Sequence, residues 1–111
     1  MKKVWADKWV AALRSGKYAQ GGGALSLNGK FCCLGVLCEI SGVPKHVLTN
    51  GLVSYDGATY VLPNSMRQLV GLKTANGFVP SCSDSLTAAN DLGYYNFDEI
   101  ADIIQICYKE L

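Results

Sequence analysis

The chain of 111 residues has few prolines, few charges and no long hydrophobic segment. Three residues are proline and 17% are charged, while 50% are hydrophobic. This composition argues against disorder, a coiled coil and a nucleic-acid-binding tail. The apolar runs are short, and Asp7 and Lys8 interrupt the N-terminal segment before a signal-like core can form. We therefore expect a single domain over residues 1–111, in the cytoplasm and away from membranes.

The sequence also lacks the usual catalytic and metal-binding patterns. Its one histidine, His46, is expected on a loop, and there is no Gly-x-Ser-x-Gly turn, so serine hydrolase chemistry is not indicated. No Cys-x-x-Cys pair occurs, which favours buried thiols over zinc or disulfides and predicts neither metal nor cofactor. A thiolate nucleophile at a helix start remains a candidate for Cys32 or Cys33. The five cysteines are Cys32, Cys33, Cys38, Cys82 and Cys107.

Hydrophobic spacing and capping signals predict an α+β fold with four or five helices and one or two short β-hairpins. Asn28-Gly29 and Asp56-Gly57 are dipeptides typical of two-residue hairpin turns, and the second is expected to join strands 52–55 and 58–62. Ile106 falls on the polar face of the last helix, which indicates a partner. The helices are predicted over residues 3–14, 33–41, 63–70, 85–92 and 97–110.

The charges are unevenly distributed. Residues 1–45 carry seven Lys or Arg against two acids, and residues 46–111 carry three against seven, giving +5 and −4. Two interpretations stay open. The polarity either docks the halves, or two copies of the chain, against each other, or it creates a basic pocket for an anionic ligand.

A glycine-rich stretch, Gly21-Gly22-Gly23, invites a phosphate-binding interpretation but matches neither nucleotide motif. Tyr18 follows Lys17 where a P-loop needs Ser or Thr, and Ser26 stands where a dinucleotide motif needs its last glycine. The stretch is either a plain turn or a loop whose backbone approaches a ligand. In the second case the predicted ligand-binding residues are Arg14, Lys17, Tyr18, Gln20, Gly21, Gly22 and Lys30.

Several blocks of the sequence resemble a family of small, uncharacterised proteins encoded by bacteriophages and prophages. The resemblance covers nearly the whole chain but carries over no catalytic residue. It rests on residues 9–25, 31–40, 55–63, 86–93 and 97–102.

The resemblance implies a phage accessory protein that acts on the host in the bacterial cytoplasm. Together with the basic first half, it leads us to expect a homo-oligomer that sequesters a small anionic nucleotide-derived ligand, such as a host immune signal, without catalysis and without binding long nucleic acid. One alternative is an interaction protein that occludes a host protein. A third is a thiol-dependent enzyme that degrades a signal molecule.

Overall fold

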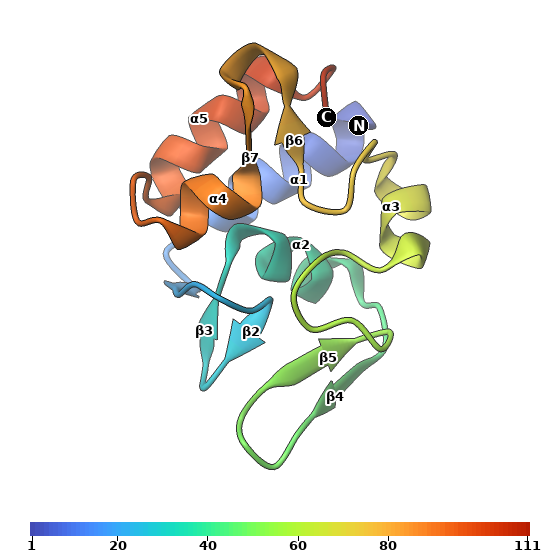
Figure 1. The fold of residues 1–111 in the computed structure, drawn as a ribbon. Coiled ribbons are helices and arrows are strands. Elements are labelled where there is room, and N and C mark those ends of the chain that lie inside the picture. Colours follow the sequence, from blue (N-terminus) through green and yellow to red (C-terminus); the bar gives the residue numbers. More distant parts are fainter.

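The helices gather toward one end of the molecule and the paired strands β2–β3 and β4–β5 toward the other (Figure 1). A computed structural model describes all 111 residues, and it confirms the predicted small α+β fold with five α-helices. The helices are α1 (Lys3–Arg14), α2 (Cys33–Ser41), α3 (Asn64–Val70), α4 (Leu86–Asp91) and α5 (Phe97–Cys107), with a 3-10 turn at Pro80–Cys82. The strands are β1 (Ala19–Gln20), β2 (Ser26–Leu27), β3 (Lys30–Phe31), β4 (Lys45–Val47), β5 (Val53–Tyr55), β6 (Phe78–Val79) and β7 (Asp84–Ser85).

Helices α1 and α5 pack side by side, and the two ends of the chain lie close together (Figure 1). Trp9 of α1 and Ile104 of α5 are fully buried in the shared core. On the outer side, the Arg14 guanidinium donates to the Asp102 carboxylate at 2.6 Å. This ion pair supports the first interpretation of the charge polarity, because it joins the basic half to the acidic half within one chain.

Helix α2 runs through the centre of the core. Its residues from Cys33 to Cys38 are all buried, and the Trp9 indole donates to the Cys33 carbonyl at 2.8 Å. Gly35 is required here, because a Cβ at this position would lie 1.8 Å from the carbonyl oxygen of Leu25. The segment leading into β2 therefore lies directly against the α2 backbone.

The first predicted hairpin is confirmed. Strands β2 and β3 are antiparallel and place Leu27 opposite Lys30. Asn28 and Gly29 form the turn with positive φ values of 52° and 79°, as expected for Asn-Gly. Strand β1, which was expected to be loop, adds to β3 in parallel.

The second predicted hairpin forms only its first pair, in which Tyr55 and Ala58 exchange backbone hydrogen bonds of 2.8 and 3.0 Å, and is wrong beyond it. Asp56 and Gly57 form a tight turn, but the residues after it are not a strand, and β5 pairs instead with β4 in antiparallel register. The expected second arm has other hydrogen-bond partners, because the Thr59 carbonyl accepts from the Leu25 N–H at 2.8 Å. His46 therefore lies in β4 rather than on a loop, with its side chain exposed.

The predicted helices agree closely with the observed ones. The last ends at Cys107, three residues early, and begins with the expected capping box, in which the Glu99 N–H donates to Asn96 at 2.9 Å. Ile106 is 80% exposed, which confirms the orientation inferred for its side chain. None of the helices has the length and apolar character needed to span a membrane.

Candidate functional site

The glycine stretch forms a loop, Gly21 to Ala24, between β1 and β2, and we call it the glycine loop. A Cβ at Gly21 would lie 2.8 Å from the Cβ of Lys30, and a Cβ at Gly22 would lie 3.3 Å from the Cα of Asp91. Gly23 has a φ of 81°, which favours glycine. Close packing or backbone conformation therefore explains why glycine occupies each of the three positions, as the plain-turn interpretation requires.

Asn90 of α4 fastens the glycine loop to the core. Its side chain is 4% exposed, and its amide donates to the Gly21 carbonyl at 2.7 Å. Its oxygen accepts from the Gln20 amide at 3.0 Å and from the Cys33 N–H at 3.2 Å. One buried side chain thus ties the loop to α2 and α4 and satisfies polar groups from all three.

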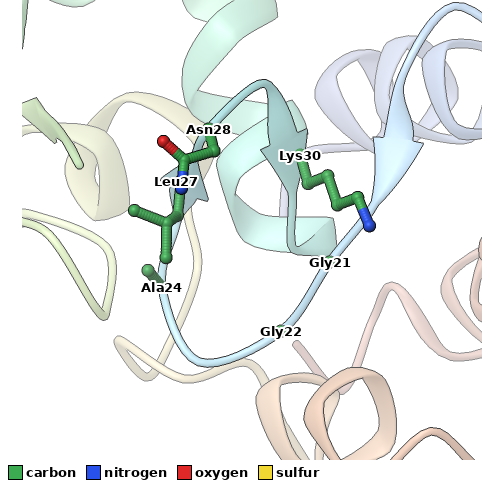
Figure 2. Close-up of a pocket in the computed structure, with 6 residues that line it drawn as sticks. All are labelled: Gly21, Gly22, Ala24, Leu27, Asn28 and Lys30. Atoms are coloured by element: carbon green, nitrogen blue, oxygen red, sulfur yellow. The ribbon is translucent and has the colours of Figure 1, made fainter. Parts of the chain in front are cut away.

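The glycine loop encloses a pocket of about 350 Å³, which we call the loop pocket. Figure 2 shows the loop curving beneath it, with Lys30 on one side and Leu27 and Asn28 on the other. Its walls are Gly21, Gly22, Ala24, Leu27, Asn28 and Lys30. This volume lies within the usual range for small-molecule sites.

Several donors at the loop pocket are not used within the chain. The backbone N–H groups of Gly22 and Ala24, which line the pocket, make no hydrogen bond to any protein acceptor, and neither does that of Gly23 between them. The Lys30 ammonium makes no ion pair. A run of free backbone N–H groups next to an unpaired lysine is the chemistry of an anion site.

Two further pockets continue from this one. The first, of about 390 Å³, shares Gly21 and Gly22 with the loop pocket, and we call it the second pocket. Its other walls are Gln20, Asn90, Asp91, Gly93, Tyr95 and Asn96. The next, which we call the third pocket, has a volume of about 290 Å³ and shares Gln20 and Asn96 with the second pocket. It is also lined by Arg14, Tyr18 and Asp98. We call the three adjoining pockets together the groove.

The structure therefore brings together most of the residues predicted from the sequence. Arg14, Tyr18, Gln20, Gly21, Gly22 and Lys30 line this chain of three pockets. Lys17 is exposed and lines none of them, so its role stays a prediction. Tyr18 is half-buried and packs edge-to-face on Phe31, with ring centroids 5.3 Å apart.

The walls are less basic than the sequence indicated. Arg14 is neutralised by Asp102 and also donates to Gln105 at 3.2 Å. Asp91 and Asp98 add carboxylates to the second and third pockets. Lys30 is thus the one wall cation without an acidic partner, and an anion is favoured at the loop pocket rather than along the whole groove.

The surroundings of Cys32 and Cys33 oppose the predicted thiolate. Cys32 does cap α2, and its sulfur accepts from the Gly35 N–H at 3.4 Å. Burial, with a smaller contribution from the nearby Asp91 carboxylate, nevertheless raises its pKa to about 11. Burial also raises the pKa of Cys33 well above its ordinary value, and that of Cys38 to about 12. The predicted helix start is correct, but desolvation outweighs the helix dipole and opposes a thiolate.

The structure contains no cluster of three or more His, Cys, Asp or Glu side chains arranged to hold a metal ion. Asp102, in the middle of α5, is engaged with Arg14. The polar groups that could hold a ligand are therefore the amides, hydroxyls, carboxylates and backbone donors of the groove.

The fold and the pockets define a small α+β protein with a polar surface site. Over residues 1–108 the chain matches the family described as "Domain of unknown function (DUF8296)", and it belongs to that family. No curated protein and no solved structure matches it.

The sequence did not predict four polar residues that line the second pocket: Asn90, Asp91, Tyr95 and Asn96. They lie about 70 residues from the glycine loop in sequence, as the Gln20–Asn90 separation of 70 shows. The position of Asn96 before Glu99 predicts a helix cap but not a pocket wall, and Asn90 falls within the helix predicted over residues 85–92. A polar residue on the inward face of that short helix was the one available signal.

Proposed function

We propose that this protein binds and sequesters a small anionic nucleotide-derived ligand at the glycine loop, without converting it. In this proposal it is a phage accessory protein of the host bacterial cytoplasm, and the ligand is a host immune signal. The observation that carries the proposal is the loop pocket itself. It combines free N–H groups of the glycine loop with an unpaired Lys30.

The surroundings support binding rather than turnover. The thiols closest to the glycine loop are buried, and their raised pKa values keep them protonated at neutral pH. His46, the one histidine, lies in β4 and lines none of the pockets. The groove thus offers hydrogen bonds, one unpaired positive charge and the carboxylates of Asp91 and Asp98, but no ionised thiol and no histidine.

The test is to incubate the purified protein with a panel of mononucleotides and cyclic dinucleotides, remove unbound material, heat the protein and analyse what is released. Recovery of intact ligand supports sequestration, and recovery of an altered ligand would indicate an enzyme. If no member of the panel is retained, the proposal is overturned.

Charge reversal of Lys30 provides the matched variant. Lys30→Glu is expected to weaken capture at least about tenfold, because it replaces the unpaired cation with an anion. Lys8→Glu makes the same charge change on α1, outside every pocket, and is expected to leave affinity within about twofold because solvent screens it. Equal losses in both variants would show a non-specific charge effect and would remove Lys30 from the site.

The second candidate, occlusion of a host protein, is favoured by exposed apolar side chains. Ile106 is 80% exposed, and Leu92 and Tyr94 are 60% and 68% exposed. A self-associating patch would also account for the homo-oligomer expected from the sequence. Light scattering at high concentration that shows only monomers would discard Ile106 as a self-association surface. It would leave the glycine-loop proposal unaffected.

A further inference from the structure

The loop pocket and the second pocket adjoin at Gly21 and Gly22, the two residues that line both. One ligand can therefore reach both pockets by lying across the glycine loop. Neither glycine has a side chain to separate the two, and any Cβ there would collide with or crowd Lys30 or Asp91. The two pockets are thus two subsites of one site.

The second pocket differs from the first in its free polar groups. The Gln20 amide nitrogen is used twice, by Asn90 at 3.0 Å and by the Tyr95 carbonyl at 2.9 Å, which leaves its oxygen without a partner. One Asp91 oxygen accepts from Asn90 at 3.0 Å, and the other makes no hydrogen bond. The second pocket therefore offers acceptors, one of them charged, where the loop pocket offers donors.

This contrast orients an anionic ligand. A phosphate is favoured at the loop pocket, where Lys30 is unpaired, and disfavoured at the second pocket, where the Asp91 carboxylate repels it. The part of the ligand over the second pocket must instead carry N–H donors. The Tyr95 side chain, 41% exposed, adds an aromatic face on which a planar base can stack.

We propose that the second pocket recognises guanine, so that the ligand is a guanine nucleotide or a cyclic dinucleotide containing guanine. Guanine presents two adjacent donors, N1–H and the exocyclic amine, which match the two oxygens of a carboxylate. Adenine presents one donor beside an acceptor on the same edge, and an acceptor facing Asp91 would be left unpaired. This inference rests on the proposed function, because it assigns the base end of the same ligand.

The test is calorimetric titration with guanosine, inosine and adenosine 5′-monophosphates and with the cyclic dinucleotides of guanine and adenine. Inosine lacks only the exocyclic amine. We expect the guanine compounds to bind at least about tenfold more tightly than the inosine and adenine compounds, because losing a donor leaves the exposed Asp91 carboxylate without a partner once the base covers it.

Asp91→Asn is the deciding variant, because it keeps the shape and removes one acceptor and the charge. It is expected to abolish the preference for guanine, while Asp7→Asn, the same change on the exposed face of α1, preserves it. Thermal unfolding of both variants checks that each is folded. If Asp91→Asn does not fold, the wild-type ratio between guanosine and inosine monophosphates still decides.

The outcomes separate this inference from the proposed function. Equal binding of all bases, lost in Lys30→Glu, would overturn guanine recognition and leave the anion site standing. Tighter binding of adenine compounds would overturn it in the same way. If no nucleotide binds and Lys30→Glu changes nothing, both proposals fail.

Discussion

Two segments built from short strands flank helix α2, and they differ in how they are attached to the rest of the molecule. The glycine loop, before α2, is tied by Asn90 to α4 and to the start of α2. The β4–β5 pair, after α2, has scattered attachments with no single buried anchor. Glu39 of α2 accepts from Tyr55 at 2.9 Å and from Lys45 at 2.8 Å, and the Gly51 carbonyl between the two strands accepts from the Asn28 N–H at 3.0 Å. β4 is exposed along its length.

The difference shows where this fold can hold a binding surface. A buried amide with four partners fixes the loop backbone, so free donors beside it keep a defined geometry. No residue of β4 or β5 lines any pocket. We therefore expect changes at the attachments of the glycine loop to affect both stability and binding, and changes at β4–β5 to affect stability alone and to a smaller extent.

Substitution of Gly35 is expected to have the largest effect. Gly35→Ala places a Cβ 1.8 Å from the Leu25 carbonyl, so α2 and the segment after the glycine loop must separate. Although alanine favours a helix, we expect a loss of about 4 kcal/mol in the free energy of unfolding, at the upper end for overpacking. Urea denaturation measures it.

The matched control lies in the other segment. Gly57 follows β5, has a φ of 85° and has open space around it. Gly57→Ala is expected to cost about 1 kcal/mol, from backbone strain alone. A loss for Gly35→Ala no greater than that for Gly57→Ala would contradict the close packing of α2 against Leu25.

Loss of the Asn90 amide is expected to have the next largest effect. Asn90→Leu preserves the approximate shape but leaves the Gly21 carbonyl and the buried Cys33 N–H without partners. We expect a loss of about 3 kcal/mol by urea denaturation, since each unsatisfied buried group is costly. Gln20→Leu, which removes a half-buried side chain from the same network, should cost less. If it costs more, Asn90 is not the principal attachment of the loop.

Alkaline pH should destabilise the core on the glycine-loop side. Burial raises the pKa of Cys32 from 9.0 to about 11. The stability that the protonated thiol contributes to the folded state is therefore complete below pH 9 and is lost as the pH rises through 11. The expected loss is about 2 kcal/mol by pH 11. Comparing urea denaturation of the wild type and Cys32→Ser at pH 8 and pH 11 measures it, because serine does not titrate. Equal losses in the two proteins would show that Cys32 does not ionise on unfolding.

The sequence predicted local structure better than long-range pairing. Both Asn28-Gly29 and Asp56-Gly57 form the tight turns that their residues favour. Only the first continues into a hairpin, because β5 has β4 as a competing partner and the chain after Gly57 bonds to Leu25 instead. Turn chemistry is a property of two residues, whereas strand pairing depends on which neighbour the rest of the fold supplies.

The same limit applies to the candidate site. Composition and spacing identified Lys30 and the glycines, which are neighbours in sequence and in space. They did not reveal that Asp102 neutralises Arg14, or that Asp91 faces Gly22 from a distant helix. The sign of charge around a pocket depends on tertiary contacts, so a net charge of +5 over residues 1–45 overstated how basic the groove is.

The smallest expected effect concerns the attachment of β4–β5. Tyr55→Phe keeps a ring that is 1% exposed and removes only the hydroxyl that donates to Glu39. Because Glu39 retains Lys45 as a partner, we expect a loss of about 1 kcal/mol in urea denaturation and no change in nucleotide capture. Lys45→Met, which breaks a half-exposed ion pair, is expected to cost less. A Tyr55→Phe protein that loses nucleotide binding would show that β4–β5 positions the glycine loop through α2, and the contrast between the two segments would then not hold.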